Sequence, residues 1–403
     1  MDNTAGLEVL ITNNTLAGRS GTELYVRDLA VELMKRGHHP IAFSTILGDV
    51  AEDLRLATVP VIDDLNVLSH PPDVIHGHHH LDTMTAALHF PQTPVVYTCH
   101  GWLPWEESPP IFPSILYYVA VDDLCLERTR TIGAIPDKNM DVIYNFVDLA
   151  RFKLRPELPS TPKSALVFSN NIRGQLLDAI QCGCNKFGIK KVDVAGRSAG
   201  NVLSKPEETL GNYDIVFAKA RCALEAMASG CAVVVADSAG LGGLVTTGNV
   251  EKLRRLNFGI RTLQNAFITE KNVLRELAEY KADDARQVSL YIRENSSILE
   301  SVDKWLAIYF KILTEWRKKN RDHTFSANQM SAASAYLRKL APIIKTRHEA
   351  ATRALRLERE LQTKRETEIR ALRFEQELLQ IKGSRSWQLI MQYRKLKSWL
   401  KKI

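Results

Sequence analysis

The chain has 403 residues, 45% of them hydrophobic and 25% charged, and this length is enough for two or three domains that each bury a core. No apolar run reaches the ~18 residues that a membrane-spanning helix needs. The net charge of +7 lies near the C-terminus, because residues 383–403 hold six basic and no acidic residues. Residues 345–382 add ten basic and seven acidic ones, so the first 344 residues are slightly acidic. This argues against a nucleic-acid-binding groove in that part of the chain.

The first region predicts alternating strands and helices. An apolar strand at residues 7–11 is followed by a polar turn containing Gly21, and then by a helix whose apolar residues recur at helical spacing from Val26 to Leu33. Further strands are predicted at residues 39–44, 59–62, 73–76, 94–98, 118–121 and 141–144. Their near-continuous hydrophobicity is typical of a parallel sheet with both faces covered.

A second region of the same kind follows a proline-rich stretch at residues 155–164, which predicts a linker between domains. The predicted elements are strands at 165–169, 191–195, 213–217 and 232–236, helices at 174–187 and 220–229, and helical patterns from 268 to 320. The expected fold is therefore α/β, with two Rossmann-like doubly wound domains, residues 1–158 and 159–325, that face a cleft. Ligands of such folds bind at the carboxyl ends of the strands.

Several short motifs occur within this strand and helix pattern. They are Gly18–Ala30 with Arg36-Gly37-His38, Asp73–His78, Thr98–Gly101, Val142–Asp148 and Leu224–Gly230, with a turn at Asp237–Gly242 after the last. Their composition and order resemble the GT-B glycosyltransferases of family 4, also called group 1. The resemblance extends over both predicted domains.

The resemblance implies a transferase that moves a sugar from a nucleotide-diphosphate-sugar to a hydroxyl acceptor, lipid-linked or polysaccharide. It further implies retention of anomeric configuration, no metal, and no cofactor besides the nucleotide-sugar as co-substrate. The N-terminal domain would bind the acceptor and the C-terminal domain the donor. On the donor side, Glu225 corresponds to the carboxylate that accepts hydrogen bonds from the ribose hydroxyls. The glycine-containing turns are also expected to contact the donor, namely Ser20 and Gly21 from one domain and Gly240, Leu241 and Gly242 from the other.

The departing diphosphate needs positive charge and prearranged donors around it, and a helix N-terminus supplies both. The predicted helix at 220–229 follows a strand end, so its start is the expected anion site. The family's basic pair after the first strand of this domain is missing, and only Arg173 lies there as a substitute. We expect Lys219 and Arg221 to replace the missing pair; the alternative is that both are solvated residues at a helix start.

A second departure is the absence of the family's other glutamate, because the position eight residues before Glu225 is Phe217. The runner-up interpretation is therefore a catalytically degenerate GT-B module that acts as a scaffold or assembly protein through its C-terminal helix. A third is an epimerase or hydrolase on the same fold.

Histidines are concentrated at the ends of two predicted strands. His100 corresponds to a catalytic histidine beside the transferring sugar, or else is a satisfied core residue. The run from His76 to His80 invites a metal site, but no acidic partner is fixed nearby in sequence, so we predict none. We expect His76 and His78 to line the acceptor side together with Trp102, which could stack on a sugar or simply pack the loop.

The C-terminal region predicts a long helix over residues 331–382, either a coiled-coil homodimer with an imperfect heptad seam or a solvated single helix. Residues 383–403 predict a separate basic amphipathic helix with an apolar stripe at Leu389, Tyr393, Leu396, Leu400 and Ile403. Such a stripe suits an anionic membrane surface or a partner helix. The segment resembles the ends of bacterial enzymes that assemble surface polysaccharides. Because Met1–Thr4 lacks the features of a secretory signal, we expect the protein in the cytoplasm, with peripheral contact at the inner face of the membrane.

Overall fold

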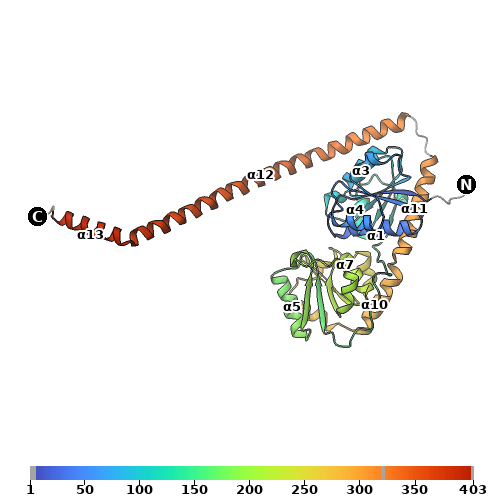
Figure 1. Cartoon of the computed structure of the whole chain (residues 1–403). Coiled ribbons are helices and arrows are strands. Elements are labelled where there is room, and N and C mark those ends of the chain that lie inside the picture. The colour runs from blue at the N-terminus through green and yellow to red at the C-terminus, as the bar shows by residue number, and fades with distance from the viewer. Residues whose placement is uncertain (1–5, 319–322, 401–403) are drawn as a thin grey trace. The chain divides into compact units, whose positions relative to one another are not determined.

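A computed structural model describes residues 6–318 and 323–400 of the chain. The predicted start at Met1–Thr4 and the last three tail residues, Lys401, Lys402 and Ile403, lie outside the described residues. The expected α/β class is confirmed, because two parallel-rich sheets alternate with helices and a long helix follows them (Figure 1).

The N-terminal domain is built on a seven-stranded parallel sheet with the strand order β3-β2-β1-β4-β5-β6-β7. Its strands are β1 Glu8–Thr12, β2 His39–Phe43, β3 Val61–Ile62, β4 Val74–His78, β5 Val95–Cys99, β6 Ile115–Ala120 and β7 Met140–Val142. Its helices are α1 Gly21–Lys35, α2 Asp49–Leu56, α3 His80–His89 and α4 Asp123–Thr131. Val9, Leu10 and Ile11 alternate between the two sheet faces and are all 0% exposed, which explains the unbroken apolar run in the sequence.

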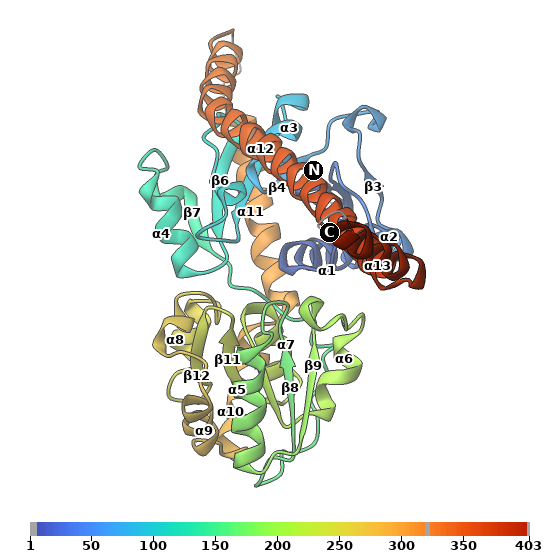
Figure 2. The same cartoon turned by 90° about the vertical axis from the view of Figure 1, so that its left-hand side faces the viewer.

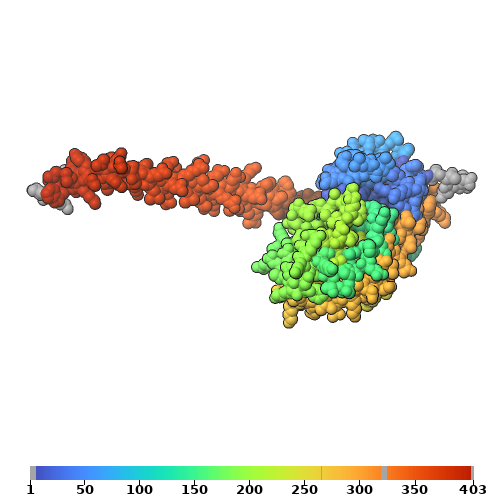
Figure 3. Space-filling view, turned by 60° about the horizontal axis from the view of Figure 1, so that its bottom comes forward, coloured from blue at the N-terminus to red at the C-terminus, as the bar shows by residue number. Residues whose placement is uncertain are grey.

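The C-terminal domain has a five-stranded sheet with the order β12-β11-β10-β8-β9, and only the β11–β12 pair is antiparallel (Figure 2). Its strands are β8 Ser164–Phe168, β9 Lys191–Ala195, β10 Ile215–Ala218, β11 Ala232–Asp237 and β12 Gly240–Leu244. Its helices are α5 Gln175–Phe187, α6 Pro206–Thr209, α7 Ala220–Ala228, α8 Val250–Arg255, α9 Glu270–Ala278 and α10 Ala282–Asn295. The two domains adjoin on the face shown in Figure 3.

The chain crosses between the two domains twice, and the crossings are hydrogen-bonded to each other. Phe146 belongs to the N-terminal core and Val147 to the C-terminal core. The Val147 amide donates to the Ser296 carbonyl at 2.8 Å, and the Ile298 amide donates to the Val147 carbonyl at 3.1 Å. The predicted linker at 155–164 lies after this point, where Arg155 pairs with Asp214 of the C-terminal domain at 3.0 Å.

Helix α11, Ile298–Lys318, returns the chain to the N-terminal domain. Trp305, Tyr309 and Ile312 are fully buried in the core that α1 and the first sheet share. The Trp305 indole donates to the Tyr25 hydroxyl at 2.9 Å, so the two helices are joined by a polar contact inside that core.

From residue 334 to residue 400 the chain forms a second unit, made of most of α12 His323–Gly383 and of α13 Arg385–Leu400. The expected long helix is therefore present, and it ends at the predicted break near Gly383. From residue 344 to residue 400 every side chain is exposed except that of Trp387, which is half-buried. Among the described helices, none combines the length and apolar content needed to span a membrane.

Candidate functional site

A cavity of about 210 Å³ lies between the two domains, and it brings together five of the residues predicted for the donor. These are Ser20, Gly21, Lys219, Arg221 and Glu225. The first two lie at the start of helix α1 of the N-terminal domain, and Lys219 and Arg221 lie at the start of helix α7, which follows strand β10; Glu225 lies one turn further along α7. The cavity therefore lies at the carboxyl ends of the C-terminal strands, where ligands of doubly wound folds bind.

The turn between β10 and α7 places Lys219 at the edge of the cavity. Lys219 is the N-cap of α7, and the next residue, Ala220, has a φ of 48°. The Lys219 ammonium lies 3.1 Å from Asp237 at the end of β11, and Asp237 also accepts a hydrogen bond from the Ser169 hydroxyl at 3.0 Å. Although burial acts in the opposite direction, Lys219 and its neighbours hold the pKa of Asp237 below its ordinary value.

Arg221 is not a free cation. Its Nε donates to Glu225 Oε1 at 2.7 Å, and its Nη2 donates to Asp28 of helix α1. The side chains of all three residues are at least 89% buried. Burial raises the pKa of Glu225, and the charge of Arg221 opposes that rise. The expectation that Arg221 presents its charge to an anion therefore does not fit its partners, because two carboxylates already neutralise it.

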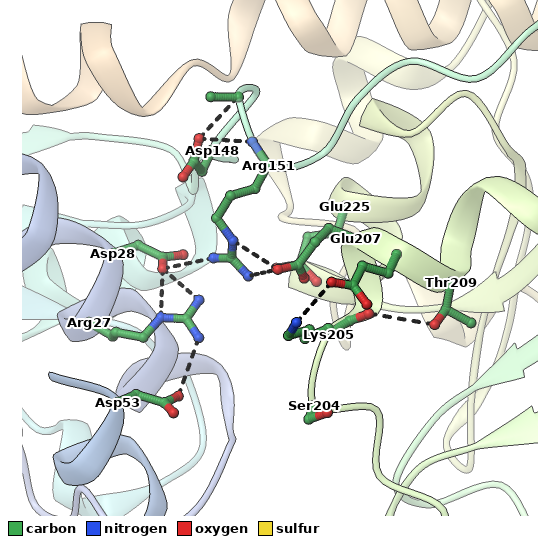
Figure 4. Close-up of polar contacts among 12 residues, drawn as sticks. Arg27, Asp28, Asp53, Asp148, Arg151, Ser204, Lys205, Glu207, Thr209 and Glu225 are labelled. Carbon is green, nitrogen blue, oxygen red and sulfur yellow. Dashed lines mark hydrogen bonds and ion pairs between the residues drawn. The ribbon is translucent and has the colours of Figure 1, made fainter. Parts of the chain in front are cut away.

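Asp28 is the centre of an ion network that joins the two domains (Figure 4). Arg27 pairs with it at 2.6 Å and Arg151 at 3.2 Å, in addition to Arg221. Arg151 extends to Glu207 of the C-terminal domain at 2.9 Å. Although burial alone would raise the pKa of Asp28, the three arginines hold it below the ordinary value.

Sequence reasoning missed Asp28 and Arg151. One signal was available for Asp28, since Gly21, Leu24 and Asp28 recur at i, i+3 and i+7 and therefore share one face of α1. Gly21 and Leu24 line the cavity. An acidic residue on that face was therefore a candidate for a partner across the cleft. Nothing in the sequence connects Arg151 with Glu207.

Positive charge without a carboxylate partner lies in a neighbouring hollow. This hollow is lined by Arg173 and Arg197 and shares Asn170 and Asn171 with the main cavity. The Arg197 amide donates to the Asn170 side chain at 2.8 Å, which fixes the loop after β9 against the loop after β8. Neither arginine forms an ion pair with a described residue. Arg173 was predicted for the donor, and Arg197 was not.

The predicted donor glycines lie elsewhere, in β12. Leu241 is 1% exposed, and its amide and carbonyl pair with Ala266 at 2.8 and 3.2 Å. Gly240 has a φ of 143°, and a Cβ there would lie 2.2 Å from the Leu263 carbonyl oxygen. Gly242 is also tightly enclosed, with Val235 2.9 Å from its would-be Cβ. Close packing of the chain on itself therefore explains these glycines, and none of the three residues lines the cavity.

The predicted acceptor-side histidines lie in the interior of the N-terminal domain. His76 is 0% exposed, and its two ring nitrogens are within hydrogen-bond distance of the Tyr309 hydroxyl at 2.5 Å and the Thr98 hydroxyl at 2.7 Å. His78 is equally buried and stacks on His76 with ring centroids 4.4 Å apart. Its Nδ1 lies 2.6 Å from Nε2 of His100. His76 is therefore a satisfied core residue.

His100 is half-buried and held from several sides. Its ring meets Tyr25 edge-on at 4.9 Å, and its backbone amide donates to Glu107 at 2.8 Å. The other oxygen of Glu107 pairs with His79 at 3.2 Å. Burial lowers the pKa of His100 to about 4, so this histidine is neutral at physiological pH and can act as a hydrogen-bond donor or acceptor.

The histidine cluster predicts a steep loss of stability in acid. Burial lowers the pKa of His76, His78 and His100, so below pH ~6.5 the unfolded chain takes up protons that the folded chain does not. Each such histidine contributes a slope of about 1.4 kcal/mol per pH unit. Denaturant unfolding between pH 7 and 5 should show a loss that is about 2 kcal/mol smaller in His76→Gln.

A parallel substitution at the exposed His89 is the matched control and should leave the slope unchanged. His79 offsets this loss only above pH ~6. Despite its burial, the pairing with Glu107 raises its pKa, so it is protonated in both states below pH ~6 and its contribution is lost only as pH rises through the folded value. Equal slopes for the native chain and His76→Gln would contradict the assignment of a neutral His76.

The third predicted acceptor-side residue, Trp102, lies in the loop after β5 and is 36% exposed. The guanidinium of Arg261, from the C-terminal domain, lies 6.0 Å from its ring centre. Arg261 also pairs with Glu127 at 2.8 Å, so Trp102 lies beside a second contact between the domains. Among residues 6–318 and 323–400, no group of three or more His, Cys, Asp or Glu side chains is arranged to hold a metal ion.

Comparison with known proteins supports the resemblance inferred from the motifs. Residues 19–151 match the family described as Glycosyltransferase Family 4. No curated protein matches the sequence significantly.

Solved structures match over both domains. One is a glycosyltransferase from Rickettsia africae, with 15% identity, 76% of this chain and 99% of that chain covered, and a TM-score of 0.55. Another is HepE from Anabaena in complex with UDP and glucose, with 14% identity, 76% and 100% coverage, and a TM-score of 0.52. A UDP complex of the same Anabaena protein gives 15% identity, the same coverage and a TM-score of 0.51. The expected GT-B fold is confirmed by these likenesses.

Proposed function

We propose that this chain moves a sugar from a nucleotide-diphosphate-sugar to a hydroxyl acceptor, on the premise of a GT-B fold whose N-terminal domain matches glycosyltransferase family 4. The observation that carries the proposal is the interdomain cavity. It joins the start of α1 with the start of α7 and is lined by the buried carboxylate of Glu225. A nucleoside in this cavity would meet a hydrogen-bond acceptor suited to its ribose hydroxyls.

The diphosphate would lie toward the neighbouring hollow. Arg173 and Arg197 carry positive charge there without a described carboxylate partner, and Lys219 lines the adjoining main cavity. Charge that is prearranged around the departing phosphates stabilises the transition state, because negative charge grows on them as the glycosidic bond breaks. We further propose retention of configuration without a metal, with the departing phosphate assisting deprotonation of the acceptor.

A panel of nucleotides tests this function. UDP, GDP and ADP, each with its nucleoside as control, are added to the full chain while its melting temperature is measured. One diphosphate at about 100 times its dissociation constant should stabilise the fold by about 2.7 kcal/mol, which is a shift of several degrees. The matching nucleotide-sugar is then tested for release of its sugar. The absence of a shift with every nucleotide would reject the proposal.

A second candidate function is a non-catalytic scaffold. Phe217 lies where the resemblance would place the second glutamate, and it is a fully buried core residue of strand β10. The charges of Lys219 and Arg221 are also paired within the protein. If none of the nucleotides raises the melting temperature and the chain still self-associates through α12, the scaffold function is favoured. Sedimentation velocity of the full chain and of a form ending before residue 345 measures that association.

We also propose that the tail places the enzyme at the cytoplasmic surface of an anionic membrane, next to a lipid-linked or polysaccharide acceptor. Helix α13 exposes Leu389, Tyr393 and Leu396 to solvent at 60–65%. No acidic residue accompanies the basic ones in residues 383–403. Exposed apolar side chains with a uniformly positive border favour anionic lipid headgroups.

A further inference from the structure

We propose that Asp28 of the N-terminal domain is a positioning residue for the donor, because it holds Arg221 so that Glu225 keeps one oxygen available for the ribose. This inference rests on the proposed function. It concerns a residue of the opposite domain that reaches the ligand only through Arg221.

The geometry of Arg221 is the first step. Its guanidinium bridges the two carboxylates, with Nε on Glu225 Oε1 at 2.7 Å and Nη2 on Asp28 Oδ2. Because a guanidinium is a rigid planar fork, fixing one edge at Asp28 also fixes the direction of the edge that faces Glu225. The three side chains are 4–11% exposed, so water does not replace these contacts.

The second step concerns the carboxylate oxygen of Glu225 that Arg221 does not contact. Arg221 donates to Oε1 of Glu225 and not to Oε2, and Glu225 lines the cavity. If the edge at Asp28 were released, the guanidinium could turn and bind both oxygens of Glu225, since the bidentate pair is the strong geometry for arginine and carboxylate. A ribose hydroxyl would then have to compete with Arg221 for the same oxygen. Asp28 therefore keeps the second oxygen of Glu225 available to accept a hydrogen bond from the ribose.

The third step is the rigidity of Asp28 itself. Arg27 and Arg151 also pair with it, and Arg151 continues to Glu207 in the C-terminal domain (Figure 4). These contacts fix the carboxylate relative to both domains. The ribose site is consequently complete only when Asp28 of α1 adjoins Arg221 at the start of α7.

The test measures discrimination between a ribose and its deoxy forms. Isothermal titration gives the dissociation constants of UDP, 2′-deoxy-UDP and 3′-deoxy-UDP, or of the guanosine set if GDP gives the larger thermal shift. The native chain should prefer the ribonucleotide at least tenfold over one deoxy form, because a site built for a hydroxyl leaves a buried group unpaired without it. In Asp28→Asn this ratio should fall to about two or less, mainly through weaker binding of the ribonucleotide.

Asp53→Asn is the matched control. Asp53 belongs to the same charged region and pairs with Arg19 and Arg27, but it does not contact Arg221. It should keep the native ratio. Should Asp28→Asn fail to fold, Arg221→Lys serves as the second variant, since it retains the charge and lacks the planar fork; it too should lose the discrimination.

The outcomes distinguish failure of the positioning role from failure of the proposed function. A native ratio in Asp28→Asn, or in Arg221→Lys, overturns the positioning role, and so does a native chain that binds UDP and both deoxy forms equally. A native chain that binds none of the nucleoside diphosphates overturns the proposed function, and the positioning role with it.

Discussion

Replacing Arg221 by methionine is expected to destabilise the folded chain by about 3–5 kcal/mol, because it leaves the buried carboxylate of Glu225 without its cation. Asp28 keeps Arg27 and Arg151, so the larger part of the loss falls on Glu225. Urea unfolding followed by circular dichroism measures the change in the free energy of unfolding.

A double variant separates the charge effect from lost packing. Arg221→Met combined with Glu225→Leu removes the unpaired charge, so a substantial part of the stability should return. The effect of Arg221→Met alone should also be smaller at pH 5 than at pH 8. Burial already raises the pKa of Glu225, and without Arg221 the carboxyl can protonate at the lower pH and so avoid the buried charge. A single variant within 0.5 kcal/mol of the native chain at both pH values would refute the buried pair.

Removal of residues 384–403 is expected to weaken binding to anionic vesicles by more than tenfold. Each basic residue near an anionic surface contributes about 1 kcal/mol, and Arg394, Lys395 and Lys397 lie on the same helix as the exposed apolar residues. Co-sedimentation with vesicles containing 30% phosphatidylglycerol, and with neutral vesicles as a control, measures the difference at 0.1 M salt.

Two matched variants separate the contributions of positive charge and of apolar side chains to vesicle binding by the tail. Neutralising Arg394, Lys395 and Lys397 to glutamine should remove the preference for anionic lipid and the sensitivity to salt. Changing Leu389, Tyr393 and Leu396 to glutamine should weaken binding to both kinds of vesicle. Full binding by the truncated chain would place the membrane contact elsewhere or reject it.

Many strands and helices of the fold could be predicted because local hydrophobic patterns mark them. Such patterns can be recognised without knowing the rest of the chain. The apolar run at 7–11 indicated a strand covered on both faces, which β1 is, and α1 buries the apolar positions that its period indicated. Strand β12 is different. Three of its five residues are glycines, which have low strand propensity, and only its pairing with β11 defines it.

The candidate site was predictable where it depends on local chemistry and not where it depends on contacts across the cleft. The start of α7 and the turn before α1 do line one cavity, because both follow strand ends in their own domains. The partner of Arg221 could not be foreseen, since Asp28 lies 193 positions away in sequence. The same holds for His76, whose hydroxyl partner Tyr309 lies 233 positions later in sequence, on helix α11.

The return of α11 to the N-terminal domain has a mechanical consequence. The segment that leads into the tail is attached to this domain, through the buried Trp305 and the hydrogen bond from Gln329 to the Pro91 carbonyl at 2.8 Å. Any force applied through the tail is therefore borne first by the N-terminal domain. The C-terminal domain receives that force only through the paired crossings at Val147 and Ser297 and through ion pairs such as Arg221 with Asp28.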